Sequence, residues 1–209
     1  MIDSTAHLVT DVDTLQARVG GEPHPAILKK IGASLDEKAI AFIGQSPFVM
    51  LATCDADGFP EVSPKGDEPG FVWVENETTL WLPDRTGNKL IMGLKNVLSN
   101  PRAALLFVIP GTEETLRVSG KVTVHDHPEV LERFASVGRP AHLAIRMSVD
   151  KCFFHCAKAF KRSSLWQAET WPKPFRVSFG EILAAKMGGD AAMQRDIDAL
   201  VDQDYRENL

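Results

Sequence analysis

The sequence predicts a mainly β protein in which an antiparallel sheet closes into a barrel, with one helix in mid-course and further helices at both ends. Short β-rich runs separated by Gly, Asp and Asn turns fill residues 48–156. Most connections between these runs are too short for the helical crossovers that parallel strands need. Helical periodicity is confined to a few segments, so the sheet is expected to dominate the fold.

The chain begins with an arm and a helix. Residues 1–33 hold only weakly amphipathic pieces and are expected to form an irregular arm. Ser34 followed by Glu37 is a capping-box signature, and apolar residues then recur at helical spacing. The sequence therefore predicts a helix over residues 34–44.

Two β-hairpins come next. Residues 48–54 and 59–63 flank an Asp-Ala-Asp-Gly turn, and residues 71–75 and 79–82 flank Asn-Glu-Thr. Each pair combines β-branched or aromatic residues with a turn of suitable composition. Four antiparallel strands are expected here.

A helix over residues 90–98, with Asn88 as its N-cap, interrupts the strands before Asn-Pro ends it. The β segments that follow are 102–109, 115–126, 142–149 and 151–156. Gly120 breaks the second of these, and residues 128–137 read as a short helix. The residues thus predict seven or eight strands.

The C-terminal part has a different character. After a Trp-Pro-Lys-Pro break, two helices are expected around 181–187 and 191–201. We therefore divide the chain into an N-terminal arm (1–33), a barrel domain (34–170) and a C-terminal helical extension (171–209).

Composition excludes several classes of protein. The 209 residues are 44% hydrophobic and 24% charged, which is typical of a folded domain. A net charge of -5 argues against a nucleic-acid-binding protein. No apolar run is long enough to cross a membrane, and the start lacks the features of a signal peptide, so a cytoplasmic location is favoured.

The cysteine pattern favours free thiols over disulfides or a metal. Cys54, Cys152 and Cys156 form an odd set without disulfide spacing, which suits a reducing compartment. If residues 151–156 form a strand, two thiols face one side and His155 the other, so they are not placed to bind one metal ion. No metal site is expected.

The run from Leu82 to Lys89 (Leu-Pro-Asp-Arg-Thr-Gly-Asn-Lys) is the best candidate for an anion site. A strand that ends, turns through a Gly and opens a helix directs free backbone N–H groups outward. Arg85 and Lys89 flank that turn, and Asn88 can cap the helix or bind a ligand. The alternative is a solvated turn with two surface cations.

Three further segments could contribute to binding. In residues 61–67, Ser63 and Lys65 share one face of a strand edge that contains Pro64. Arg117 lies in mid-strand, where its charge needs a nearby Glu or an anionic ligand. Residues 158–166 combine three cations, two hydroxyls and a Trp, which suits a phosphate and a flat ring or, alternatively, a basic amphipathic helix.

No hydrolase motif, P-loop or pair of metal-spaced His residues is present, and His125 and His127 fit an exposed strand end better than a metal. Taken together, however, the binding segments resemble the pyridoxamine-phosphate-oxidase-like family of FMN-binding split-barrel proteins. The resemblance extends over about residues 39–166. It is carried by Ser-Pro-Lys-Gly-Asp at 63–67, Pro-Asp-Arg-Thr-Gly-Asn-Lys at 83–89, Asn-Pro-Arg at 100–102, Glu-Thr-Leu-Arg-Val-Ser-Gly at 114–120, and Arg-Ser with Leu-Trp at 162–166.

That resemblance implies a homodimer of six-stranded split barrels with FMN at the subunit interface. Arg85, Asn88 and Lys89 would hold the phosphate, the strand from Val62 to Lys65 would follow the ribityl chain and ring, and Arg117 would face the pyrimidine end. Arg162 and Ser163 would come from the partner subunit or a neighbouring strand. The implied cofactor residues are Val62, Ser63, Pro64, Lys65, Pro83, Arg85, Asn88, Lys89, Arg117, Arg162, Ser163 and Trp166.

The implied function is an FMN-dependent oxidoreductase acting on a small molecule, with a nicotinamide cofactor or oxygen as the other reactant. No residue is an evident general acid or base, so a non-catalytic flavin-binding or redox-sensing module is the alternative. A split barrel that uses a deazaflavin or haem is a further one. The chain has one tyrosine, Tyr205, and lacks the substrate-phosphate residues of the vitamin enzyme, which argues against activity on pyridoxamine phosphate.

Overall fold

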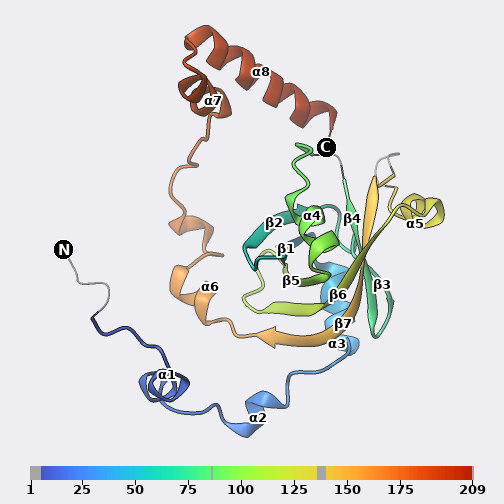
Figure 1. The fold of residues 1–209 in the computed structure, drawn as a ribbon, viewed down its shortest axis with the longest axis vertical. Helices are drawn as coiled ribbons and strands as arrows, with labels where there is room; N and C mark the ends of the chain where they lie inside the picture. The colour runs from blue at the N-terminus through green and yellow to red at the C-terminus, as the bar shows by residue number, and fades with distance from the viewer. Residues whose placement is uncertain (1–5, 86, 136–139, 209) are drawn as a thin grey trace.

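The computed structural model describes residues 6–85, 87–135 and 140–208. In these residues a seven-stranded antiparallel sheet, in the order β2-β1-β5-β6-β7-β4-β3, curls round an apolar core (Figure 1). The strands are β1 Phe48–Cys54, β2 Pro60–Gly66, β3 Trp73–Asn76, β4 Thr79–Asp84, β5 Arg102–Val108, β6 Thr115–His125 and β7 Leu143–His155. The mainly β, antiparallel architecture expected from the sequence is confirmed.

The strand count and closure differ from the six-stranded barrel that the family resemblance implied. The sheet has seven strands, and its two edge strands, β2 and β3, are not paired with each other in the described residues. Strand β3 is short, and its register against β4 shifts between Val74 and Asn76, next to the hairpin turn. The result is a strongly curled, open sheet.

Strand β7 is one continuous strand where the sequence suggested two. The register of β6 against β7 shifts between Ser119 and Gly120, so Asp150 is the extra residue of a β-bulge. Gly120 is needed there, because a Cβ at this position would overlap the carbonyl oxygen of Ser148. The break seen at Gly120 in the sequence therefore bends the sheet without ending a strand.

The core lies inside the curl and includes one face of α3 (Glu37–Gln45). Ala39 and Ile43 of this helix are buried with residues from most of the strands. The helix begins after Asp36, whose carboxylate accepts a hydrogen bond from the Ala39 N–H at 2.8 Å. The expected helix is confirmed, but Asp36, and not Ser34, is its N-cap, because Asp36 is the residue placed to reach that donor.

A smaller apolar cluster lies at the β4–β7 part of the sheet, under α5 (Pro128–Arg133). Phe134 packs there with Trp81 and Ala144, and Trp73 stacks on Trp81 with ring centroids 6.0 Å apart. Within the described residues, the helix expected over 128–137 ends at Arg133, and the last residues of that prediction lie outside them.

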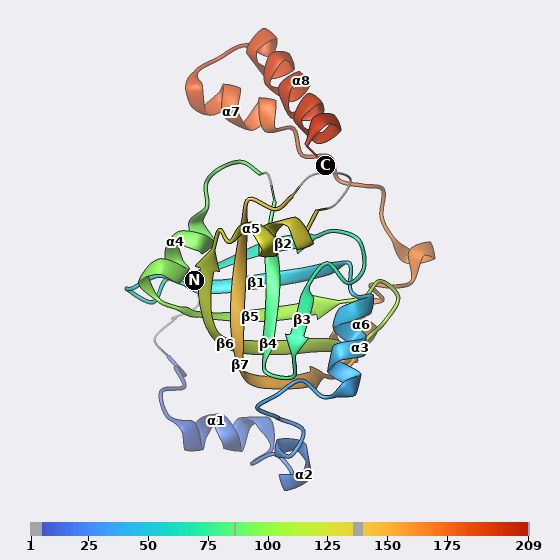
Figure 2. The ribbon, with the colours of Figure 1, turned by 90° about the vertical axis from the view of Figure 1, so that its right-hand side faces the viewer.

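The helices at the two ends of the chain stand away from the sheet (Figures 1 and 2). The N-terminal arm contains α1 Val12–Val19 and α2 Pro25–Leu28, and the C-terminal part contains α6 Lys158–Ser163, a 3-10 turn at Ala168–Thr170, α7 Phe179–Met187 and α8 Ala191–Glu207. Both views place the α7–α8 hairpin beyond one end of the sheet and α1–α2 beyond the other. In the described residues, no helix combines the length and the hydropathy needed to span a bilayer.

Candidate functional site

A cavity of about 560 Å³ opens where β2, the end of β4, the loop before α4 (Met92–Ser99) and the start of β7 meet. Its volume falls within the roughly 300–1,000 Å³ typical of small-molecule sites. We call it the β2 pocket. The predicted residues that line it are Val62, Ser63, Pro64, Lys65, Arg85, Asn88 and Lys89. The strand edge and the basic turn, which the sequence indicated separately, therefore meet in one cavity.

Strand β2 presents alternate side chains to this pocket. Glu61, Ser63 and Lys65 are half-buried, as the period of two in a strand requires. The ammonium of Lys65 lies 2.7 Å from Oδ1 of Asp84, the last residue of β4. This ion pair fixes a positive charge at the pocket wall and joins two strands that are far apart in the sheet order.

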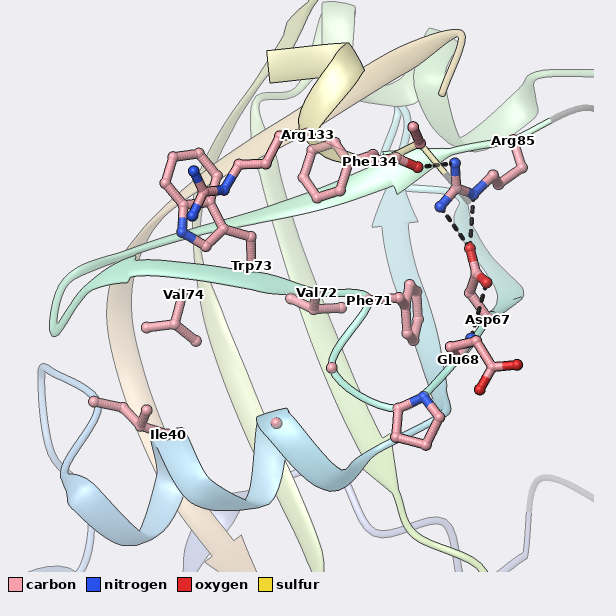
Figure 3. A pocket seen from close by; sticks show the side chains of 14 residues that line it. Ile40, Asp67, Glu68, Phe71, Val72, Trp73, Val74, Arg85, Arg133 and Phe134 are labelled. Carbon is pink, nitrogen blue, oxygen red and sulfur yellow. Dashed lines mark hydrogen bonds and ion pairs between the residues drawn. The ribbon is translucent and has the colours of Figure 1, made fainter. Parts of the chain in front are cut away.

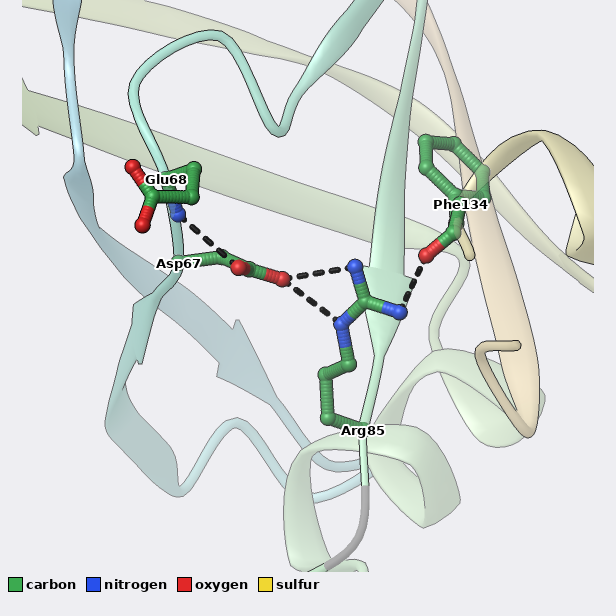
Figure 4. A network of polar contacts seen from close by, with 4 residues as sticks. All are labelled: Asp67, Glu68, Arg85 and Phe134. Atoms are coloured by element: carbon green, nitrogen blue, oxygen red, sulfur yellow. Dashed lines mark hydrogen bonds and ion pairs between the residues drawn. The ribbon is translucent and has the colours of Figure 1, made fainter. Parts of the chain in front are cut away.

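Arg85 is held on two sides (Figure 4). Its Nε and Nη2 donate to Oδ2 of Asp67 at 2.7 and 2.6 Å, and its Nη1 donates to the carbonyl oxygen of Phe134. The other carboxylate oxygen of Asp67 accepts from the Glu68 N–H at 2.8 Å. The guanidinium is thus fixed in place, between the end of β2 and the end of α5.

The loop before α4 differs from the prediction. The helix expected over residues 90–98 starts at Met92, because Lys89 and Ile91 have left-handed backbone conformations with φ of 60° and 46°. Asn88 is not the helix N-cap: its Oδ1 accepts from the Leu90 N–H at 3.1 Å and so closes a turn before the helix. Ile91 occupies the N-cap position of α4 and has no side-chain group that can cap the first turn.

The charges around the pocket favour an anion by a small margin. Of the described residues, three cations (Lys65, Arg85 and Lys89) and two carboxylates (Glu61 and Asp84) line it. Lys89 is exposed, and its ammonium has no ion-pair partner among the residues that the structure describes. A phosphate could therefore bind Lys89 directly and use the remaining donors of Lys65.

The structure places Pro83 and Arg117 outside the lining of the pocket. Pro83 is buried within β4, next to Asp84. Arg117 points outward from β6, with its guanidinium carbon 5.9 Å from the centroid of the Phe153 ring. Partial burial and the charges of Arg117 and Lys30 lower the pKa of His155, which marks a positive region at this end of β6 and β7.

The predicted residues of the 158–166 cluster also lie outside the β2 pocket, around α6. Arg162 and Ser163 are exposed at the end of that helix. Trp166 donates from Nε1 to the Thr112 carbonyl at 2.8 Å and stacks on Phe160, with ring centroids 5.5 Å apart. This group therefore lies by the loop that leads into β6, and the single chain does not bring it to the pocket.

Several residues that line the pocket were not identified from the sequence. His142 and Asp84 lie on its wall because β4 pairs with β7, a contact between distant segments that no local pattern reveals. The apolar segment Leu90–Met92 forms part of the rim, and all three side chains are exposed. The sequence predicted a helix from residue 90, and the left-handed backbone at Lys89 and Ile91 places Leu90 and Ile91 at the pocket rim instead.

A second cavity, of about 550 Å³, shares Arg85 with the first and also has Asp67 in its lining (Figure 3). Phe71, Trp73 and Phe134 form its aromatic walls. The guanidinium of Arg133 lies over the Trp73 ring, 4.0 Å from the centroid (Figure 3). Because Arg85 borders both cavities, its position affects both.

The cysteines are unpaired, with Cys152 buried, Cys54 half-buried and Cys156 exposed. Burial, together with the nearby charge of Asp36, raises the pKa of the Cys152 thiol to about 11. Among the described residues, no group of three or more His, Cys, Asp or Glu side chains is arranged to hold a metal ion.

Comparison with known proteins gives one family match. A family model described as pyridoxamine 5'-phosphate oxidase matches residues 35–156. A search of curated proteins finds no match.

Solved structures similar to this chain include a putative pyridoxamine 5'-phosphate oxidase from Lactobacillus delbrueckii, at 25% identity, with 58% of this chain and 95% of that chain covered and a TM-score of 0.46. HupZ from Group A Streptococcus is 17% identical, with 57% and 92% covered and a TM-score of 0.46. HutZ from Vibrio cholerae, described as a haem storage protein, is 15% identical, with 58% and 93% covered and a TM-score of 0.41.

Proposed function

The chain belongs to the pyridoxamine 5'-phosphate oxidase family, and from that premise we propose that it binds FMN in the β2 pocket and is an oxidoreductase acting on a small molecule. The observation that carries the proposal is the meeting of β2 and the basic loop in one cavity of about 560 Å³. A strand edge and a cationic turn that line the same cavity suit a ligand with a phosphate at one end and a flat polar ring at the other.

The phosphate end is assigned to the loop. Lys89 and Asn88 are exposed there, and Lys65 and Arg85 stand on the adjoining wall. An ammonium has three donors, so Lys65 can keep its carboxylate partner and still donate to phosphate oxygens, while Arg85 adds positive charge beside the site. The contacts are charge-assisted, which makes them stronger than neutral hydrogen bonds.

The ribityl chain and ring are assigned to β2. This strand is at the edge of the sheet, so one side of its backbone is available to a ligand. Ser63 adds a hydroxyl, while the rim residues Leu90 and Ile91 offer apolar contact to a ring face, and Val62 lies in the strand with its side chain on the other face. The residues present therefore fit FMN in both charge and polarity.

FMN, when bound, supplies hydride or electron transfer. The chain's own residues bind it, orient it and limit its contact with water. Among the described residues that line the β2 pocket, His142 is the only histidine, and it places an imidazole beside the proposed ligand. We assign the second reactant as a nicotinamide cofactor, which would donate electrons to the flavin, or oxygen, which would accept them.

A homodimer is part of this proposal. Arg117, Arg162, Ser163 and Trp166 lie outside the pocket of their own chain, so we assign them to the pocket of a partner subunit, with Arg117 at the pyrimidine end of the ring. The outward face of β1 and β2 supports such a contact because it exposes large apolar side chains, among them Met50. A fixed guanidinium at that end of the ring would stabilise the anionic reduced flavin.

One observation favours haem as a second candidate. His142 on the pocket wall offers the imidazole nitrogen that haem iron commonly takes as an axial ligand. The three cations that line the pocket favour the phosphate of FMN instead, although they would also attract haem propionates.

The test is a ligand titration with the full-length purified protein. FMN, riboflavin, a deazaflavin and haemin are each titrated, with flavin fluorescence or Soret absorbance as the readout. FMN binding that is at least tenfold tighter than riboflavin binding supports the proposal, since only FMN carries the phosphate. Absence of FMN uptake, or preference for haemin that is lost in His142→Ala, overturns it.

A further inference from the structure

We propose that the α7–α8 hairpin of one copy closes over the rim of the β2 pocket in a second copy, with α7 seated on the apolar segment Leu90–Met92. The inference rests on the proposed function only in that the covered pocket is the one assigned to FMN. The contact itself is argued from the two surfaces.

The hairpin is a compact unit. Gly180 of α7 lies so close to α8 that a Cβ there would overlap the backbone of Gln194, and Ala184 is buried at the same crossing. The carboxylate of Asp198 in α8 accepts from the Gly180 N–H and the Ser178 hydroxyl, at 2.8 and 2.7 Å. These contacts fix one face of α7 against α8.

The remaining face of α7 is exposed and mainly apolar, although Lys186 also lies on it. Phe179, Ile182, Leu183 and Met187 are exposed, the last by 68%. Among the described elements, α7 and α8 have substantial contact only with each other. Short helices gain most of their stability by packing an apolar face against another element, so this face requires a partner.

The pocket rim is a matching surface. Leu90, Ile91 and Met92 are consecutive exposed apolar residues, and Ile91 is a β-branched residue in the left-handed region. Such a conformation costs free energy and persists where surrounding structure holds it. Covering this segment would bury three large side chains at the mouth of the β2 pocket.

The charges of the hairpin and of the pocket rim are also complementary. The hairpin carries exposed carboxylates on α8, at Asp196, Asp202 and Asp204, and one exposed cation on α7, Lys186, whereas Lys89 and Lys95 are exposed on either side of the rim segment. Complementary charges of this kind set orientation and exclude other partners more than they add affinity. The acidic hairpin therefore fits this rim.

The path of the chain favours a second copy of this protein as the partner of the hairpin. The hairpin stands beyond the end of the sheet at which the loop before α4 projects, but apart from it (Figures 1 and 2). The linker that leads to it also carries exposed apolar residues, Trp171 and Phe175, the latter exposed by 92%. A linker that packed along its own barrel would bury these residues, so we assign them to the surface of a partner.

The consequence for the site is that one chain supplies the cavity and the other its cover. Closing α7 over Leu90–Met92 would reduce the access of water to whatever occupies the pocket. In a twofold dimer the same contact would form twice, because each copy has one hairpin and one pocket rim.

The test uses the full-length protein with a benzophenone amino acid in place of Met187, prepared as a mixture of ¹⁴N and ¹⁵N chains. Cross-linked peptides are identified by mass spectrometry. Peptides that join a ¹⁴N hairpin to a ¹⁵N segment containing Leu90–Met92 support the proposal. Cross-links found only within single chains, or none to this segment, overturn it.

Leu183→Glu in the same background should reduce the interchain cross-link at least fivefold, because it places a charge in the apolar contact. Ala185→Glu is the matched control, since it adds the same charge about 200° away on the same helix, beside Glu181. Equal loss in both variants, or in neither, overturns the assignment of this face. The cross-link is measured with and without FMN while FMN uptake is measured by absorbance, so loss of flavin binding and loss of the contact are read separately.

Discussion

The ammonium of Lys65 lies 2.7 Å from Oδ1 of Asp84, and this pair bridges β2 and the last residue of β4 on the wall of the β2 pocket. The two side chains are only 25% and 14% exposed. The carboxylate of Asp84 therefore lies within the proposed phosphate site and partly offsets the positive charge of the cations around it. The balance between these charges sets how tightly an anion binds.

Asp84→Asn should tighten FMN binding about fivefold, since removing a nearby negative charge relieves roughly 1 kcal/mol of repulsion on the phosphate. The measurement is fluorescence titration at low and high salt, and the gain should shrink at high salt. Asp126→Asn, an exposed carboxylate outside the pocket, is the control. Weaker binding in Asp84→Asn would mean that Asp84 acts mainly by positioning Lys65.

Lys89→Ala should weaken FMN binding by about 1.5–3 kcal/mol, which is the usual value of a charge-assisted contact, and Arg85→Ala together with Lys89→Ala should weaken it further. Riboflavin binding should not change, because riboflavin has no phosphate. Lys95→Ala, an exposed cation of α4 outside the pocket lining, is the control. Unchanged FMN affinity in the double variant would exclude this loop as the phosphate site.

Local patterns were sufficient for most of the fold. Hairpin turns, strand alternation and helical spacing predicted β1, β5, β6 and α7 close to their observed bounds, whereas β2 and α8 extend three and six residues beyond the predicted ends. Errors arose where two signals competed. Asp36 and Ser34 are both good N-caps, and only the geometry of the Ala39 N–H decides between them. The β-bulge at Asp150 could not be predicted from the sequence either, because a bulge is defined by the pairing with the partner strand.

The site could be predicted only in part for the same reason. Val62–Lys65 and Arg85–Lys89 were found because their residue types carry the chemistry in short segments. His142 reaches the pocket through the pairing of β4 with β7, and Asp84 through its ion pair with Lys65. Both depend on contacts between distant parts of the chain, which one sequence does not reveal.

Arg117→Met should lower the midpoint potential of the bound flavin, because the variant removes the positive charge assigned to the pyrimidine end of the reduced ring. Spectroelectrochemical titration of the FMN-loaded protein measures this shift. Lys121→Met is the control, as Lys121 is also exposed on β6. If both variants have the potential of the parent protein, Arg117 has no role at the ring.

Gly120→Ala should destabilise the fold by at least about 2 kcal/mol, since its Cβ would overlap the Ser148 carbonyl oxygen and force β6 and β7 apart. Urea unfolding followed by circular dichroism gives the free energy of unfolding. Gly44→Ala is the control, because a Cβ at that α3 position meets no atom within 4 Å and Ala favours a helix. Equal stability of the two variants would argue against close contact at the bulge.

Cys152 should make the folded protein less stable as the pH rises from about 9 to about 11. Its thiol has a pKa of about 11 in the fold, raised from an ordinary value of 9.0 by burial and by Asp36. In that window the unfolded chain has lost the thiol proton and the folded chain retains it, so raising the pH favours unfolding. Urea unfolding across this range should show a shallower loss of stability in Cys152→Ala than in the parent protein. Parallel curves for the two proteins would mean that the thiol titrates alike in both states.

At pH 7.5 a thiol reagent should modify the exposed Cys156 quickly and Cys152 only after unfolding.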